Sequence, residues 1–138
     1  MTVTALDSSV VIDVLLDGSE FAEASAAALN VAREAGSLKI CTVVLAEIAQ
    51  TFPDAQDSLA FLHSMEIAVE SVDAEVALAT ADLRRGPKLG SRILADYLIA
   101  AHGALAADRL LTRDAGFSKL DLFGLEVVTP SDLLAEIS

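Results

Sequence analysis

The sequence has few aromatic residues, few cations and almost no cysteine. Aromatic residues make up 4% of the 138 residues and tryptophan is absent, so the core must be built mainly from Ala, Leu, Val and Ile. The single cysteine, Cys41, excludes an internal disulfide and suits a reducing compartment. Nine Lys and Arg against 21 Asp and Glu give a net charge of -12. Such a chain cannot grip duplex nucleic acid by broad phosphate neutralisation.

Apolar runs long enough to cross a membrane are also missing, although 54% of the residues are hydrophobic. Asp96, His102 and Asp108 interrupt the longest candidate, so we expect no contact with a membrane. The strand-like run that begins at Val3 leaves no room for a signal peptide. We therefore expect a cytoplasmic protein with one domain over residues 1–138.

Short apolar runs alternate with helical patterns along the chain. The strands are predicted at Thr2–Leu6, Leu38–Cys41, Ile67–Val69, Arg109–Thr112 and Leu125–Thr129. The helices are predicted at Ser8–Leu16, Phe21–Ala35, Val43–Thr51, Asp54–Met65, Asp73–Arg85, Arg92–Leu105 and Pro130–Ile137, with a loop at Gly86-Pro-Lys-Leu-Gly. This alternation predicts an α/β fold whose parallel sheet is covered by helices on both faces.

Four acidic residues, Asp7, Glu47, Asp96 and Asp114, stand in apolar segments where a charge is unexpected. Asp7 and Asp114 follow predicted strands, whereas Glu47 and Asp96 lie near the beginnings of helices. In a parallel sheet all four positions belong to the carboxyl edge, where active sites of open α/β folds lie. Several carboxylates in one place need a cation, and oxygen ligands suit Mg²⁺ or Mn²⁺. The pattern predicts a metal-dependent hydrolase.

Three of these carboxylates also have structural explanations. Asp7 could be a helix N-cap, Asp96 could pair with Arg92 one turn earlier, and Asp114 before Ala-Gly could be a turn residue. Glu47 is the hardest to explain in this way, because no Lys or Arg lies within a helical turn of it. The case for a metal site depends on the four residues together.

Other polar residues give weaker predictions. The hydroxyls of Ser8 and Thr112, beside candidate ligands, could orient a metal-bound water. We expect Asp13 on the exposed face of the first helix, and we expect His63 and His102 to face solvent or to be satisfied in packing.

The cations are unevenly distributed. Four of them form a cluster: Arg84, Arg85, Lys88 and Arg92. This cluster is either a solvated helix end or a patch before Asp96 that steers phosphate groups. Arg113 either pairs with Asp114 or holds a phosphate. These five cations are the candidates for RNA binding.

The segments around the four carboxylates resemble the PIN domain (PilT N-terminus) family, in particular the VapC-type toxins of toxin–antitoxin systems. The resemblance covers nearly the whole chain and rests on Leu6-Asp-Ser-Ser-Val-Val-Ile-Asp, Ala46-Glu, Ala95-Asp-Tyr-Leu-Ile-Ala-Ala, Leu111-Thr-Arg-Asp-Ala-Gly-Phe and Val127-Val-Thr-Pro-Ser-Asp-Leu-Leu. It implies a three-layer α/β/α sandwich around a mostly parallel sheet. It also implies that Asp7, Glu47, Asp96 and Asp114 bind Mg²⁺ or Mn²⁺ in an endoribonuclease, which acts as a toxin, forms a homodimer and is inhibited by a cognate antitoxin.

Two other functions stay open. A PIN-like interaction module with weak or absent catalysis would suit the net charge of -12. A metal phosphohydrolase of small substrates is less favoured, because Asp7-Ser8-Ser9 lacks the second Asp that haloacid-dehalogenase-like phosphatases use. The chain also departs from the PIN pattern after Asp114, where Gly116, Phe117 and Ser118 supply no further carboxylate, so the number of metals stays open.

Overall fold

A parallel sheet forms the centre of the computed structural model, which describes all residues except 17, 87–91, 115, 118–123 and 138. The strands of the described part are β1 (Thr2–Leu6), β2 (Gly36–Cys41), β3 (Ile67–Glu70), β4 (Arg109–Leu111) and β5 (Glu126–Val128). They form a five-stranded sheet in the order β3-β2-β1-β4-β5, and every neighbouring pair is parallel. The prediction of a parallel sheet is confirmed.

Helices connect the strands, as the alternation in the sequence predicts. They are α1 (Ser8–Leu15), α2 (Ala22–Ala35), α3 (Thr42–Ala49), α4 (Asp57–Ser64), α5 (Ala74–Arg85), α6 (Leu94–Ala106) and α7 (Pro130–Ala135). Side-chain caps explain several beginnings: Asp7 accepts a hydrogen bond from Ser8 at the start of α1, and Asp73 accepts one from Val76 at the start of α5. Helix α6 begins two residues later than predicted, where the Ile93 amide donates to Asp96 Oδ2 at 3.4 Å.

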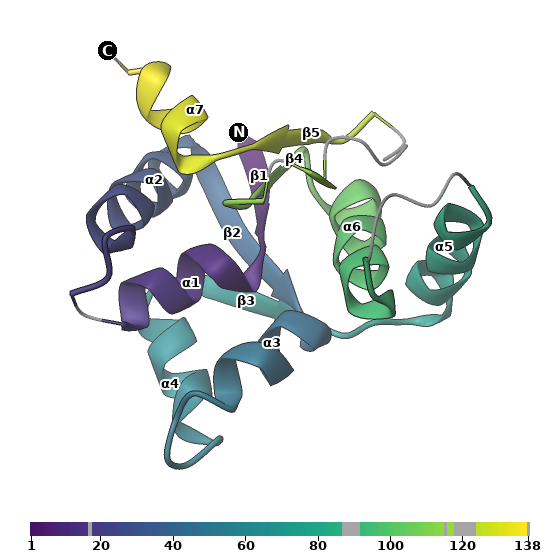
Figure 1. Cartoon of the computed structure of the whole chain (residues 1–138), viewed down its shortest axis with the longest axis horizontal. Helices are drawn as coiled ribbons and strands as arrows, with labels where there is room; N and C mark the ends of the chain where they lie inside the picture. The colour runs from purple at the N-terminus through teal and green to yellow at the C-terminus, as the bar shows by residue number, and fades with distance from the viewer. Residues whose placement is uncertain (17, 87–91, 115, 118–123, 138) are drawn as a thin grey trace.

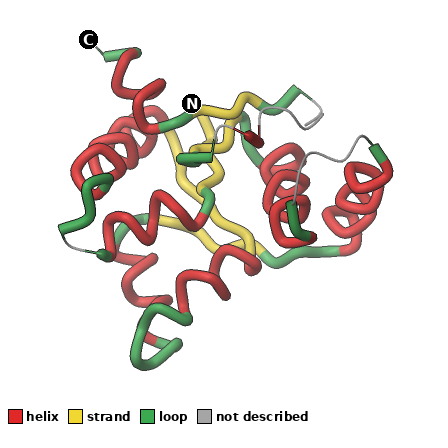
Figure 2. The backbone as a smooth tube through the Cα atoms, viewed as in Figure 1, coloured by secondary structure: helices red, strands yellow, loops and turns green. Residues whose placement is uncertain are grey.

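Helices cover both faces of the sheet (Figures 1 and 2). On one side α2 packs against β1 and β2 and also contacts α1 and α7. On the other side α6 packs against β1 and β4, and α5 lies outside it. Helices α3 and α4 pack against each other and against β3. The three-layer α/β/α sandwich is therefore confirmed.

The central strands β1 and β4 end side by side at the carboxyl edge of the sheet. Their last residues, Leu6 and Leu111, are register partners and are fully buried. The pairing continues past the strands, because the Asp7 amide donates to the Leu111 carbonyl at 3.0 Å. Thr112 is linked to the neighbouring strand β5, since its amide donates to the Val128 carbonyl at 3.0 Å. Two predicted site residues, Asp7 and Thr112, are thus held rigidly at this edge.

None of the helices in the described residues combines the length and the apolar character that crossing a membrane requires.

Candidate metal centre at the carboxyl edge

Asp7 is the most firmly held of the candidate ligands. Its Oδ1 accepts the Ser8 amide at 2.8 Å, so it does cap α1. Its Oδ2 accepts the hydroxyls of Thr112 at 2.7 Å and of Ser9 at 3.2 Å. The residue is only 8% exposed. Capping and a role as metal ligand are compatible, because a carboxylate has about four lone-pair directions and three are used here.

The carboxyl of Asp7 is costly to ionise in this setting. Burial raises its pKa, hydrogen bonds from Thr112, Ser8 and Ser9 act in the opposite direction, and the charge of Asp96 raises the pKa further. The net shift is upward, so the donors do not fully offset the lost hydration. A nearby positive charge would restore the ionised form.

Glu47 on α3 has a side-chain oxygen that is buried and unpartnered. Its Oε1 has no hydrogen-bond partner among the described residues. The pKa of Glu47 is raised by burial first, and then by the charges of Asp7 and Asp96, while a hydrogen bond from the Ser8 side chain lowers it. Buried polar atoms in proteins almost always have a partner, so an exception at a cluster of carboxylates is consistent with a site for a cation.

Asp96 and Asp114 are joined by the guanidinium of Arg92. Its Nη2 lies 2.8 Å from Asp114 Oδ2, and its Nη1 lies 3.7 Å from Asp96 Oδ2. The guanidinium also covers the ring of Phe117, with 4.4 Å between Cζ and the ring centroid. The Arg92 side chain is 13% exposed, which is low for an arginine. One cation of the chain itself therefore neutralises part of the acidic cluster.

Asp114 is also connected to Asp7 through Thr112. The Thr112 hydroxyl donates to Asp7 and accepts the Asp114 amide at 3.0 Å. The Oδ1 of Asp114 accepts the Gly116 amide at 3.0 Å, so the turn role suggested by the sequence is present as well. Contacts and electrostatic interactions thus connect all four carboxylates at one edge of the sheet.

The described carboxylates meet only part of what a divalent cation needs. In the part of the chain that the structure describes, no group of three or more Asp, Glu, His or Cys side chains is arranged so that it could hold a metal ion. Two features nevertheless fit Mg²⁺ or Mn²⁺: the candidate donors are all carboxylate oxygens, and Glu47 Oε1 is buried without a partner. Arg92 meanwhile occupies one oxygen of Asp114 and lies near Asp96.

The described members of the predicted basic cluster have different partners, and their role in RNA binding stays a prediction. Arg85 is 80% exposed and lies 3.7 Å from Asp82, and Arg84 stacks on the Tyr97 ring at 4.9 Å. Arg92 is turned towards the carboxylates. Lys88 lies outside the described residues.

Arg113 pairs with Asp13 and not with Asp114. Its Nε lies 2.7 Å from Asp13 Oδ2, which also accepts the Ser25 hydroxyl at 2.7 Å. The expectation that Asp13 is exposed was wrong, since the residue is only 3% exposed. The compensating cation is 100 positions away in the sequence, so no local pattern reveals it.

Sequence reasoning missed the role of Ser9. It assigned a hydroxyl function to Ser8, whose side chain hydrogen-bonds Glu47, whereas Ser9 donates to Asp7 and accepts the Arg113 amide at 3.3 Å. The available signal was position, because Ser9 is the second residue of a helix capped by Asp7.

His102 is buried and hydrogen-bonded, which is one of the two environments predicted for it. It is buried, and its Nε2 lies 2.8 Å from Glu70 Oε1. Burial raises the pKa of Glu70, but hydrogen bonds from His102 and Lys39 outweigh it and the net shift is downward. His63 is exposed. Among the described residues, neither histidine forms a hydrogen bond or an ion pair with any of the four carboxylates.

Comparison of the sequence with known protein families gives a match over residues 4–122 to the PIN domain. No curated protein matches the chain.

Three solved structures illustrate the similarity of fold. VapBC2 from Rickettsia felis, bound to a promoter DNA fragment, has a TM-score of 0.68 at 16% identity, covering 92% of this chain and 98% of that one. A toxin–antitoxin complex from Klebsiella pneumoniae has a TM-score of 0.68 at 24% identity, covering 92% and 97%. VapC20 of Mycobacterium tuberculosis, described as a toxin that cleaves the sarcin–ricin loop, has a TM-score of 0.67 at 14% identity, covering 89% and 98%. At these identities the likeness concerns the fold.

Proposed function

Because the chain belongs to the PIN domain family, we propose that it is a metal-dependent endoribonuclease that hydrolyses RNA phosphodiester bonds with Mg²⁺ or Mn²⁺. The observation that carries this proposal is the buried, unpartnered Oε1 of Glu47. It belongs to a carboxyl whose pKa is raised by burial and by the charges of Asp7 and Asp96. A protein that retains such an unfavourable cluster gains most from it if a cation binds there.

In this proposal Asp7, Glu47, Asp96 and Asp114 hold the ion. A bound divalent ion lowers the pKa of a coordinated water and offsets charge on a phosphoryl oxygen. The chain contributes orientation: Thr112 fixes one oxygen of Asp7 and the backbone of Asp114 at the same time, and Ser9 supports Asp7 from α1. The Ser8 side chain hydrogen-bonds Glu47. In this proposal Ser8 therefore positions a metal ligand, in place of the predicted role of orienting a metal-bound water.

The partners proposed are an RNA substrate, a cognate antitoxin and a second copy of the chain. Toxin–antitoxin complexes of similar fold support the antitoxin, and VapC20, described as a toxin that cleaves the sarcin–ricin loop, supports a nucleic-acid substrate. Light scattering after size exclusion tests the homodimer. A mass of one chain at every protein concentration would exclude it.

A cleavage assay tests the reaction. Purified protein should cut RNA that contains single-stranded segments in Mg²⁺ or Mn²⁺, and the cutting should stop when EDTA is added. Asp7→Asn and Asp96→Asn should each reduce cutting by at least about a hundredfold, because each removes a charged ligand. Asp82→Asn is the matched control, since it removes the same charge from an exposed carboxyl whose one ion pair among the described residues is with Arg85. Cutting that survives EDTA and both substitutions would reject the assignment.

A second function is favoured by one observation. The guanidinium of Arg92 already neutralises part of the cluster, so a PIN-like interaction module with no metal is physically possible. Isothermal titration calorimetry separates the two proposals. If Mn²⁺ binds to the wild-type protein but not to Asp7→Asn, the nuclease is supported. If no divalent ion binds at millimolar concentration, the interaction module is supported.

A further inference from the structure

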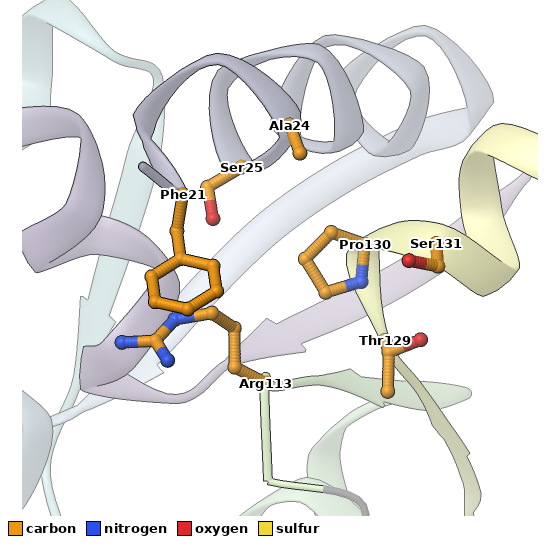
Figure 3. A pocket seen from close by; sticks show the side chains of 7 residues that line it. All are labelled: Phe21, Ala24, Ser25, Arg113, Thr129, Pro130 and Ser131. Atoms are coloured by element: carbon orange, nitrogen blue, oxygen red, sulfur yellow. The ribbon is translucent and has the colours of Figure 1, made fainter. Parts of the chain in front are cut away.

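A pocket of about 380 Å³ lies beside the acidic cluster and is not part of it. It is formed by the beginning of α2, the second residue after β4 and the junction of β5 with α7, through Phe21, Ala24, Ser25, Arg113, Thr129, Pro130 and Ser131 (Figure 3). Its volume falls within the range of small-molecule sites. Arg113 lines the pocket and is the residue before Asp114, so the pocket borders the proposed metal centre.

Arg113 is held in the pocket by one edge of its guanidinium. Its Nε bonds Asp13 Oδ2 at 2.7 Å, and Ser25, which lines the pocket, donates to the same oxygen at 2.7 Å. The guanidinium is ion-paired with Asp13 through this edge, and its two terminal amino groups donate no hydrogen bond within the described parts of the chain. The guanidinium is therefore pre-oriented and keeps donors for an anion, and this arrangement suits a phosphate.

Phe21 adds an aromatic surface to this cation. The Arg113 Cζ lies 4.1 Å from the centroid of the Phe21 ring, and Figure 3 shows the guanidinium beside the ring with Pro130 across the pocket. Phe21 is 40% exposed, so part of the ring is open to a ligand. Aromatic rings and arginine planes are the surfaces on which unpaired bases of RNA stack. Thr129 and Ser131 also line the pocket, and the Thr129 hydroxyl accepts the Asp132 amide at 3.2 Å.

The charge balance favours a nucleotide in this pocket over an acidic peptide. With a net charge of -12, the molecule repels polyanions over much of its surface, so an anion needs a specific contact and not a general field. Arg113 offers that contact beside a stacking surface, which a nucleotide uses in full and a carboxylate side chain does not.

Ser9 connects the pocket to the acidic cluster. Its hydroxyl accepts the Arg113 amide at 3.3 Å and donates to Asp7 at 3.2 Å. We propose that the pocket binds one nucleotide of single-stranded RNA next to the phosphodiester that is cleaved, with its base against Phe21 and Pro130 and its phosphate on Arg113. This inference rests on the proposed nuclease function and adds to it the place and chemistry of a substrate contact.

Phe21→Trp gives a direct readout, because the chain contains no other tryptophan. In EDTA, which prevents cleavage, a short single-stranded RNA and a nucleoside 5′-monophosphate should both quench the emission. The monophosphate should bind roughly tenfold more tightly than the matching nucleoside, as expected for a charge-assisted hydrogen bond. Adding Arg113→Gln should remove that difference, and Arg113→Lys should restore it only in part.

A second tryptophan position controls for unspecific quenching. Phe52→Trp replaces a ring that pairs with Phe61 at 5.9 Å between centroids, and its emission should not respond to RNA. If Phe21→Trp does not fold, Phe21→Leu can be compared with wild type by fluorescence anisotropy of labelled RNA. Loss of the stacking surface should then weaken binding about tenfold.

The outcomes separate this inference from the proposed function. RNA that is cut by the wild type but leaves the emission of Phe21→Trp unchanged would overturn the pocket assignment and leave the nuclease intact. Quenching that ignores Arg113→Gln, or that only an antitoxin peptide produces, would also overturn it. Quenching by RNA together with no cleavage in any divalent ion would support the pocket and reject the nuclease.

Discussion

Replacing Arg92 by Gln should make the protein bind Mn²⁺ more tightly. Among the described residues, Arg92 is the cation that pairs with the acidic cluster: its Nη2 lies 2.8 Å from Asp114 Oδ2, and its Nη1 lies 3.7 Å from Asp96 Oδ2. It competes with a metal for charge and for one oxygen of Asp114. Gln keeps much of the length and polarity of the side chain but removes the charge.

The size of the effect follows from the contact distance. A divalent ion that shared the Asp114 carboxylate with Arg92 would lie about 5 Å from the guanidinium, because a metal–oxygen bond of about 2.1 Å would extend the 2.8 Å contact. The Asp114 side chain is half exposed, so the dielectric constant of water applies, and the repulsion is about 1.7 kcal/mol. This corresponds to a roughly tenfold or greater change in affinity.

An opposing effect is smaller. Arg92 also orders two carboxylates, and its loss lets them move. Ion pairs of this exposure contribute about 0–1 kcal/mol, so ordering does not outweigh the repulsion. The metal-free protein should accordingly lose up to about 1 kcal/mol of stability while its affinity for metal rises.

Isothermal titration with Mn²⁺ measures the affinity, and thermal denaturation in EDTA measures the metal-free stability. Arg85→Gln is the matched control, because it removes the same charge from a side chain that is 80% exposed. The one ion pair of Arg85 among the described residues is with Asp82. Arg92→Lys, which keeps the charge, should stay near the wild-type affinity. Gly116→Ala offers a further variant: the added methyl group would collide with the Arg92 guanidinium and displace it without removing its charge.

Competition between Arg92 and the metal is excluded if Arg92→Gln binds Mn²⁺ as weakly as wild type or more weakly. Weaker binding would identify Arg92 as a residue that positions the ligands in the metal-bound state. Equal effects of Arg92→Gln and Arg85→Gln would show that only net charge matters.

Two further predictions concern stability. Because the pKa of Asp7 and that of Glu47 are raised above ordinary values of 3.8 and 4.5, both carboxyls are protonated in the folded and unfolded states at low pH. The free energy of unfolding of the metal-free protein should fall as pH rises from about 4 through the raised pKa values of the two carboxyls. Glu47→Gln should flatten this pH dependence in denaturant titrations. A free energy of unfolding that rises over this range would contradict the upward pKa shifts. Asp13→Ala should cost about 2 kcal/mol in chemical denaturation because it leaves the buried Ser25 hydroxyl without its acceptor. The exposed-site control Asp82→Ala should cost under about 0.5 kcal/mol, and equal costs would contradict a structural role for Asp13.

Much of the fold could be predicted because the signals are local. The alternation of apolar runs with helical patterns identified every strand and helix of the described residues, with bounds that differ by three residues at most. Asp7 and Asp73 cap helices as their positions before apolar segments predict. The parallel topology followed from that alternation, since strands joined through helices run in one direction.

The candidate site was predictable at the level of residues but not of contacts. The four acidic residues were found because charge in an apolar segment needs an explanation, and the structure connects them at one edge. Which hydroxyl holds Asp7 was not predictable, because Ser8 and Ser9 are adjacent in the first turn of α1 and differ only in the direction in which they leave the helix axis. Their assignment as metal ligands stays a prediction.

The amino-acid sequence alone was enough to predict the elements, the parallel sheet and the four carboxylates at its edge. What neutralises each charge is set by the folded chain: Arg113 for Asp13, Arg92 for Asp114, and no partner for Glu47 Oε1 among the described residues. The reason is physical. Helix and strand patterns reflect preferences between residues a few positions apart, whereas a buried charge is stabilised by whatever the strand order brings beside it. For Asp13 that partner comes from 100 positions away.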